Sequence, residues 1–483
     1  MRFEEYAKYD ATGLAQLVNR QQIAPWELAQ LAQTAIGKLN PSLNAVIETY
    51  PERCLPSHDF GDTSAPLAGV PFLLKDTGAT EAGKAQACGS RIGAGYIADT
   101  NAYLTDRYNN AGLNILGRST MPEFAQAATT ESAFTGATRN PWDTARSTGG
   151  SSGGAAAAVA SGMVPMAHGT DTGGSIRIPA ACCGLVGLKP SRGRITKGPL
   201  LDETLYGGLN TEHVLTRSVR DTALALDISC QPGPGDPFVI QAPSRPYVEE
   251  LQREWEPMRI AVTWQTYTGK AVAPEMAAAT RHIADLCSDL GHQVIEAAPP
   301  LDGEAYARAD EVVWAYSTAH EVKRLASATG NPICDRYLER PTLEAMNLAE
   351  RLTLDDWFAA MATYNRMNRD IASFFQEVDI LITPTVASTA PPLGALNSNR
   401  DISFQAFMEV TGAFCPHTSI FNVTGQPAIS LPLAISESGL PIGIQFVARY
   451  GDEAALLRLA TYFEQALPWH DRLPPSHISR MEF

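Results

Sequence analysis

The spacing of apolar residues along the chain predicts an alternation of helices and buried strands. Segments such as PWELAQLAQTAIGKLN, from Pro25, repeat their apolar residues with helical spacing. Short runs dense in Ile, Val and Leu indicate strands that are covered on both faces. Because strands and helices alternate, parallel pairing beneath covering helices is favoured, and we predict an α/β layered fold. The strands are expected at 259–264, 292–298, 379–386, 428–435 and 440–448, with a short one at 114–116, and further helices at 102–111, 155–163, 219–228 and 274–291.

The first two predicted helices contain none of the candidate catalytic residues. TGLAQLVNR has Thr12 as its predicted N-cap, and the second helix begins with Pro25 at its first position. We expect these helices, at about 12–39, to pack on the rest of the chain or to extend from it. A buried strand follows at Val70 to Leu74 and ends at Lys75, so it delivers a lysine at its end. No linker, charge run or repeat marks a domain boundary.

Composition and charge narrow the classes of protein. The 37 Lys and Arg residues against 52 Asp and Glu give a formal charge of −15, which disfavours nucleic acid and anionic membranes as partners. The N-terminus lacks the pattern of a secretory signal, and no run of 18 apolar residues is present, so we expect a soluble cytoplasmic protein. The eight cysteines form no repeated C-x-x-C, and the histidines form no H-x-x-x-H pair. We therefore expect neither a disulfide framework nor a metal site.

Two clusters rich in Gly and Ser, at 149–154 and 171–175, flank a run of alanines. The first cluster matches the nucleophile elbow G-x-S-x-G, but RNPWDTARST precedes it where an elbow requires a buried strand. Neither phosphate-binding fingerprint, G-x-x-x-x-G-K-[ST] or G-x-G-x-x-G, is present. A flexible linker is disfavoured because both clusters lie between well-patterned elements.

Serine chemistry needs a base for the hydroxyl and hydrogen-bond donors for the oxyanion. The glycines before Ser175 allow successive backbone N–H groups to converge on one point, which makes Ser175 a candidate nucleophile beside its own oxyanion hole. His168 is equally consistent with a core residue and with a catalyst. Lys75 can act as a base if burial lowers its pKa. The alternative for Lys75 is an ordinary salt bridge, for example with Asp76, and no S-x-x-K motif offers another Ser-Lys pair.

These stretches together resemble the amidase signature family. GGSSGG (149–154), GTDTGGSIRIPA (169–180) and the upstream VPFLLKD carry the resemblance, with Lys75, Ser151 and Ser175 separated by 76 and 24 residues. It extends through GRSTMPEFA (117–125), ATRNPWD (137–143), CGLVGLKPSRGR (183–194), TRSVRD (216–221), DILITPT and FNVTGQPAISLP (421–432). The resemblance implies one domain over 1–483, an α/β/α sandwich with a large mixed sheet covered by helices.

The resemblance also implies roles for individual residues. Ser175 would be the nucleophile, Ser151 a bridging serine after a cis peptide bond, and Lys75 the base of a Ser-cisSer-Lys triad. Ser152 would support Lys75, and the N–H groups of Thr172, Gly173, Gly174 and Ser175 would form the oxyanion hole. Asp171 and Arg177 match positions that brace this loop. The implied activity is hydrolysis of the C–N bond of a small linear carboxamide through an acyl-enzyme, without a cofactor or metal, by a protein for which a homodimer is a candidate assembly.

Departures from the family pattern bear on the substrate and on rival functions. Thr120 stands where the family commonly has Asn, which affects detail of the pocket. Ile178 follows Arg177 where A subunits of the glutamine-dependent aminoacyl-tRNA amidotransferase usually have Gln, so a free-standing amidase is favoured. An acyltransferase or amide synthetase would use the same acyl-enzyme and stays open. Within the family, the chain most resembles bacterial amidases of the 6-aminohexanoate cyclic-dimer hydrolase type. The candidates for a substrate pocket, which are alternatively ordinary core packing, are Phe124, Trp142, Trp314, Phe414 and Gln426.

Overall fold

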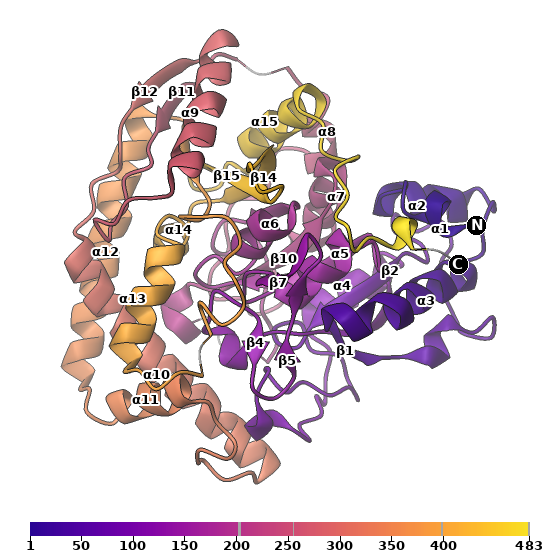
Figure 1. The fold of residues 1–483 in the computed structure, drawn as a ribbon, viewed down its shortest axis with the longest axis horizontal. Helices are drawn as coiled ribbons and strands as arrows, with labels where there is room; N and C mark the ends of the chain where they lie inside the picture. The colour runs from indigo at the N-terminus through magenta and orange to yellow at the C-terminus, as the bar shows by residue number, and fades with distance from the viewer. Residues whose placement is uncertain (201–203, 255, 398, 482–483) are drawn as a thin grey trace.

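A mixed sheet of eight strands runs through the protein (Figure 1), in a computed structural model that describes residues 1–200, 204–254, 256–397 and 399–481. Strand β11 pairs in parallel with β12 and β13, and the remaining neighbours are antiparallel. In their order of pairing, the strands are β12 (Gln293–Glu296), β11 (Arg259–Val262), β13 (Ile380–Pro384), β15 (Pro441–Ala448), β14 (Ala428–Ile435), β9 (Val186–Lys189), β10 (Thr211–Thr216) and β8 (Met166–Asp171).

Helices cover both faces of this sheet, as side chains of alternating direction on β15 demonstrate. A Cβ on Gly443 would lie 2.4 Å from Ala181 of α6 (Arg177–Cys183), so α6 packs directly on this face. Phe446, of opposite parity along the strand, contacts Phe463 of α15 (Glu453–Ala466) with ring centroids 5.3 Å apart. Because successive side chains of a strand point to opposite faces, α6 and α15 enclose the sheet between them.

The remaining helices extend this arrangement. Helices α9 (Pro274–Asp289) and α7 (Val219–Ser229) also pack on the large sheet. Four helices gather at its side (Figure 1), namely α10 (Gly303–Thr329), α11 (Arg340–Ala349), α12 (Leu354–Glu377) and α13 (Phe404–Phe414). The others are α1 (Phe3–Tyr6), α2 (Ala11–Asn19), α3 (Pro25–Leu43), α4 (Tyr103–Asn110), α8 (Tyr247–Glu250) and α14 (Ile420–Thr424), and short strands occur at β4 (Glu131–Ser132), β5 (Gly136–Ala137), β6 (Arg139–Asn140) and β7 (Asp143–Ser147).

A second sheet of three strands carries the lysine that the sequence singled out. It consists of β1 (Val46–Thr49), β3 (Asn114–Ser119) and β2 (Pro71–Lys75), with β2 and β3 parallel. Helix α5 (Gly153–Ala160) packs against β2 of this sheet and against β8 of the large one. All of its residues are buried, and a Cβ on Gly154 would lie 2.2 Å from Thr120 Oγ1. Small side chains are therefore what allows α5 to fit between the two sheets.

The predicted fold class is confirmed, with several corrections in detail. The predicted strands and helices are present with shifted ends, but in the large sheet parallel pairing is confined to β11 and its two neighbours, and β2 belongs to the smaller sheet. Asp10, not Thr12, caps α2 through a hydrogen bond from Gly13 N, because the Thr12 hydroxyl donates to Asp221 instead. Strands β1 and β8 to β10 and helices α6, α10 to α13 and α15 were among the elements that were not predicted. No helix in the described residues combines the length and apolarity that crossing a bilayer requires.

The close approach of α6 to β15 predicts a position that is intolerant of side chains. Gly443→Val should lower the free energy of unfolding by about 1–3 kcal/mol, because the added carbons overlap Ala181 in a packed core. Gly37→Ala is the matched control, since nothing lies within 4 Å of a Cβ at that exposed position of α3 and Ala should stabilise the helix by about 0.5–1 kcal/mol. Denaturant midpoints measure both, and an unchanged midpoint for Gly443→Val would contradict this packing.

Candidate active site

Three segments that are distant in sequence meet where the two sheets face each other. Lys75 is the last residue of β2, Ser151 and Ser152 lie just before α5, and Asp171 is the last residue of β8. The backbone N–H of Ser152 donates to the carbonyl oxygen of Ser175 over 3.1 Å, which joins the two Gly and Ser clusters directly. The peptide bond between Gly150 and Ser151 is cis. The structure thus brings Lys75, Ser151 and Ser175 into one region.

The amine of Lys75 is surrounded by hydroxyl groups. Its Nζ lies 2.6 Å from Ser151 Oγ, 3.0 Å from Ser152 Oγ and 2.8 Å from Thr170 Oγ1. The side chain is fully buried. An ammonium group has three N–H donors, so these three hydroxyls satisfy it completely. Thr170 is a partner that the sequence patterns did not identify.

Hydrogen-bond accounting restricts which hydroxyl can donate to a neutral Lys75. Ser152 Oγ donates to the Thr170 carbonyl oxygen over 3.2 Å, so towards Lys75 it can only accept. A neutral amine has one lone pair, which must then face Ser151 or Thr170. Ser151 has the shortest contact and follows Gly150, which lines a cavity with Ser175. Ser151 is therefore the hydroxyl best placed to give its proton to the amine and to receive another.

Burial changes the acid strength of Lys75. Loss of hydration lowers the pKa of its amine from 10.5 to about 7, although the negative charges of Asp171 and Glu212 oppose this effect. The alternative of an ion pair with Asp76 is not realised, because Asp76 faces Arg118 at 3.5 Å and accepts hydrogen bonds from two backbone N–H groups. A large share of Lys75 is therefore neutral at physiological pH.

His168 braces the lysine strand, and in the described part of the chain neither hydrogen bond of its ring involves a serine. Its Nδ1 accepts the backbone N–H of Lys75 over 3.3 Å, and so its Nε2 carries the hydrogen that points at Glu212 Oε2, 2.8 Å away. Glu212 also accepts the backbone N–H of Ala79. Both ring nitrogens are hydrogen-bonded, one to the backbone of Lys75 and the other to Glu212, which favours a structural role for His168 over a catalytic one.

A buried ion pair fixes the loop that carries Ser175. All five N–H groups of Arg177 are hydrogen-bonded, two to Asp171 and the others to the Thr418 carbonyl, Gln445 and Asn422. Burial alone would raise the pKa of the Asp171 carboxyl, but the charge and hydrogen bonds of Arg177 outweigh it and hold that pKa below its usual range. The loop is therefore held by charge-assisted contacts that keep Asp171 ionised.

The same loop presents backbone N–H groups. Asp171 Oδ1 accepts the N–H of Gly174 over 2.8 Å, so this group is occupied in the structure. Among the described residues, none accepts a hydrogen bond from the N–H of Thr172, Gly173 or Ser175. Gly174 has φ +127°, and a Cβ there would lie 2.4 Å from Thr418 Oγ1, so only glycine fits. Of the four predicted donors, three are free to meet an oxyanion and Gly174 instead anchors the loop.

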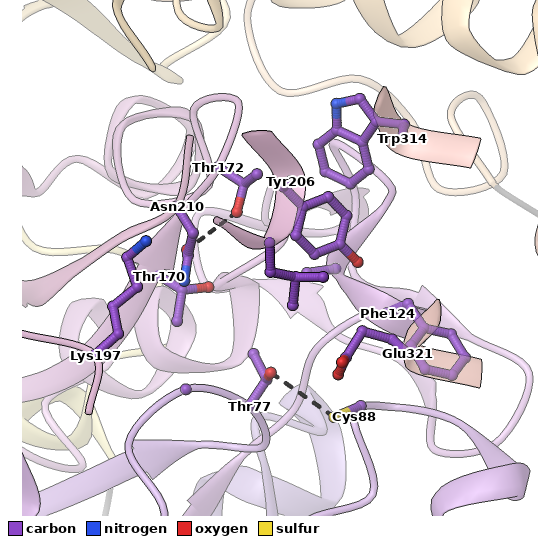
Figure 2. Close-up of a pocket in the computed structure, with 13 residues that line it drawn as sticks. Thr77, Cys88, Phe124, Thr170, Thr172, Lys197, Tyr206, Asn210, Trp314 and Glu321 are labelled. Carbon is purple, nitrogen blue, oxygen red and sulfur yellow. Dashed lines mark hydrogen bonds between the residues drawn. The ribbon is translucent and has the colours of Figure 1, made fainter. Parts of the chain in front are cut away.

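Two cavities meet at this loop. Ser175 lines the first with Gly150, Gly173, Ala125 and Trp314. The second lies on the side of Thr170 and Thr172 and also touches Ala125 and Trp314. Figure 2 shows it with Lys197 across from the aromatic side chains and with a hydrogen bond from Thr172 to Asn210. Small cavities, of about 60 Å³ and about 50 Å³, therefore border the loop on both sides.

The five candidate pocket residues separate into two groups. Phe124 lines the second cavity (Figure 2), and Trp314 lines both. Trp142 lies elsewhere, because its Nε1 donates to the Cys183 carbonyl beside Gly184. Phe414 packs in the main core, and Gln426 is hydrogen-bonded to Thr424, so neither borders these cavities. Sequence reasoning missed Tyr206, whose ring centroid is 4.9 Å from that of Trp314, because nothing in its local sequence marks it.

Comparisons with known proteins agree with this architecture. The family model named Amidase matches residues 27–457. A 6-aminohexanoate-cyclic-dimer hydrolase from Paenarthrobacter ureafaciens is 38% identical over 96% of both chains, and an acylamidase from Rhodococcus erythropolis is 33% identical over 97% of both. A solved structure of a 6-aminohexanoate cyclic dimer hydrolase complexed with substrate aligns with a TM-score of 0.90 and 36% identity, over 97% of this chain and 99% of the other. The chain belongs to the amidase signature family.

Proposed function

We propose that the protein hydrolyses the C–N bond of small linear carboxamides through an acyl-enzyme on Ser175. The observation that carries this proposal is the 2.6 Å contact between Ser151 Oγ and the buried Nζ of Lys75, at the edge of the cavity that Ser175 lines. A serine hydroxyl is a weak nucleophile unless a base takes its proton. Neutral Lys75 can act as this base. Because Ser152 can only accept from Lys75 and Ser151 makes the shortest contact, Ser151 is the hydroxyl that would connect Lys75 to Ser175.

In the first half of the reaction, Ser175 Oγ attacks the amide carbon. Its proton passes to Ser151 Oγ, and the proton of Ser151 passes to Lys75 Nζ, which becomes an ammonium held by three hydroxyls. The carbonyl oxygen becomes an oxyanion that accepts hydrogen bonds from the free N–H groups of Thr172, Gly173 and Ser175. These donors are fixed in advance because Asp171 and Arg177 hold the loop.

In the second half, the relay runs in reverse. Lys75 returns its proton through Ser151 to the departing nitrogen, because an amine must be protonated to leave. The C–N bond breaks and leaves an ester on Ser175. Water then attacks the ester carbon while its proton passes through Ser151 to Lys75. The bond between this carbon and Ser175 Oγ breaks, the relay returns the proton to Ser175 Oγ, and the carboxylic acid and free enzyme are formed.

The class of substrate follows from the relatives and the cavities. The relatives are named as a 6-aminohexanoate-cyclic-dimer hydrolase and as an acylamidase. The Ser175 cavity here is lined largely by small and apolar residues such as Ala127, Ala128 and Ile178. This supports small organic amides with an apolar portion next to the carbonyl. Cytoplasmic localisation, a single domain over 1–483 and a homodimer stay proposals that go with this function.

Covalent labelling tests the assignment of the nucleophile. A fluorophosphonate should label the wild-type protein, and Ser175→Ala should abolish the label because the attacking hydroxyl is gone. Ser438→Ala should label normally, because the exposed Ser438 hydroxyl is hydrogen-bonded to that of Ser436 and lies outside the Ser175 cavity. Intact-mass spectrometry gives the readout. A label that persists in Ser175→Ala would refute the acyl-enzyme on this residue.

The lowered pKa of Lys75 predicts how activity depends on pH. Below about pH 7 the amine is protonated and cannot accept the relayed proton, so kcat/KM should rise through about pH 7 and level off above it. Lys75→Ala should lose about 10²- to 10⁴-fold in rate and the pH-dependent limb with it. Initial rates on one amide from pH 5 to 10 provide the measurement. A flat wild-type profile would contradict Lys75 as the base.

Partitioning of the acyl-enzyme distinguishes hydrolysis from acyl transfer. A panel of aliphatic, aryl and peptide-like amides, scored for ammonia or amine release, should reveal substrates. With added hydroxylamine, free acid should remain the main product at low hydroxylamine concentrations. If hydroxamate dominates there, water is a poor acceptor and an acyltransferase or amide synthetase becomes the better description.

A further inference from the structure

The cavity of Ser175 contains a carboxyl group that the proposed reaction does not use. Asp310, on α10, lines this cavity and is 8% exposed. Tyr364 OH donates to its Oδ1 over 2.9 Å. Some buried carboxylates of the protein face a guanidinium group, as Asp171 faces Arg177 and Glu453 faces Arg194, whereas Glu123 and Asp221 are held by hydroxyl and backbone N–H donors. Among the described residues, no Lys, Arg or His forms an ion pair with Asp310.

A buried carboxylate without a cation is costly unless something compensates its charge. Tyr364, Tyr306 and Trp314 are the donors beside Asp310, and all three are uncharged, so they leave the charge of an ionised carboxylate uncompensated and at most part of its roughly four acceptor sites open. Burial raises the pKa of Asp310 to about 6, against the opposing hydrogen bonds of these three side chains. Above that pH the group is mostly ionised, and a cationic ligand would supply the missing charge.

The surroundings of Asp310 suit a cation with an organic body. Tyr267 and Trp314 line the same cavity, and the ring of Tyr267 meets that of Tyr306 edge to face with centroids 4.9 Å apart. Aromatic faces attract ammonium groups through their quadrupole. Carboxylate and aromatic rings together are therefore complementary to an alkylammonium group, while the small apolar residues beside Ser175 suit the hydrocarbon that joins it to the amide.

The Ser175 cavity continues into a larger outer cavity between α10 and α13, helices that lie together in Figure 1. The two cavities share Tyr267, Asp310, Met408 and Gly412. The inner one has about 60 Å³ and the outer one about 330 Å³, so Asp310 stands at a junction that opens outward. The outer lining adds Glu304, Glu311 and Glu409 against Lys270 and Arg308. Carboxylates thus outnumber cations along the approach, which favours entry of positive charge.

We propose that the substrates of Ser175 carry an ammonium group a few bonds from the scissile amide, and that Asp310 is the specificity-determining residue that accepts it. This inference rests on the proposed amidase function and narrows its substrate class. The ammonium group binds in the ground state and takes no part in the relay between Ser175, Ser151 and Lys75. Asp310 therefore selects the substrate and does not perform the chemistry.

Pairs of isosteric amides test the inference. The first pair, 5-aminopentanamide and hexanamide, places ammonium or methyl on the acyl side of the amide. The second pair, N-(4-aminobutyl)acetamide and N-pentylacetamide, places it on the amine side. We expect the ammonium member of at least one pair to have a kcat/KM higher by about 10- to 100-fold, as for a hydrogen bond to a charged group. Equal values, or a preference for methyl in both pairs, would overturn the proposal.

Asp310→Asn identifies the residue responsible. The amide keeps an acceptor for Tyr364 but removes the charge, so the ammonium preference should vanish while kcat/KM for the methyl isostere changes less than about threefold. An equal loss on both members would indicate a purely structural role and overturn the proposal. Asp285→Asn, which removes one charge from the exposed face of α9, should retain the preference and is the matched control.

Binding to Ser175→Ala separates this inference from the proposed function. Calorimetry with the same pairs measures affinity without turnover, and the ammonium member should bind more tightly by a similar factor that Asp310→Asn abolishes. If no amide is hydrolysed but the binding preference is present, the proposed hydrolysis fails and the cation site stands. If amides are hydrolysed but no binding preference is present, the cation site fails and hydrolysis stands.

Discussion

The burial of one amine, that of Lys75, determines whether this site can accept and return a proton near neutral pH. An exposed lysine is almost entirely protonated at neutral pH and cannot accept a proton. Lys75 is buried at the end of β2, where its lost hydration is replaced by the hydroxyls of Ser151, Ser152 and Thr170. Three neutral hydroxyls satisfy the hydrogen bonds of an ammonium but provide no negative charge to hold its proton. The result is an amine that can both accept and return a proton near neutral pH.

The fold supplies the conditions for this arrangement by close packing. Helix α5 fits between the two sheets because its residues are glycine, alanine and one valine, and its N-terminal end places Ser151 and Ser152 against Lys75. Every side-chain N–H group of Arg177 donates a hydrogen bond, either to Asp171 or to a residue between Thr418 and Gln445. Breaking a buried pair of this kind typically costs about 3–5 kcal/mol, so the loop that carries Ser175 and its backbone N–H groups is firmly held. Arg177 thus neutralises the charge of Asp171, whereas the groups that contact Lys75 Nζ are uncharged hydroxyls.

Local signals predicted the layered fold and marked Lys75 and Ser175 as candidates, because strand ends and Gly and Ser clusters can be recognised in the sequence. The place of Ser151 beside them was implied only by the resemblance to the amidase signature family. Helix α10 escaped prediction because it is buried against several neighbours and shows no single apolar stripe, whereas α11 and α12 each carry an apolar face that the sequence does display. Tyr206, Thr170 and Asp310 were missed for a different reason. Their importance comes from which cavity they border, and only the packing of distant segments decides that. Trp142, Phe414 and Gln426 looked like pocket residues by type alone, yet packing places them elsewhere.

The acidity of Lys75 is most directly measured by NMR on protein labelled with ¹³C at Cε of lysine. The chain has eight lysines, so the resonances are few, and Lys75→Arg identifies the one that matters. The account predicts a titration midpoint near 7 for Lys75. Lys189, also buried, should titrate in the same range and must be assigned separately. A midpoint for Lys75 near 10.5 would mean that the amine is charged throughout the physiological range, and the relay through Ser151 would have no acceptor.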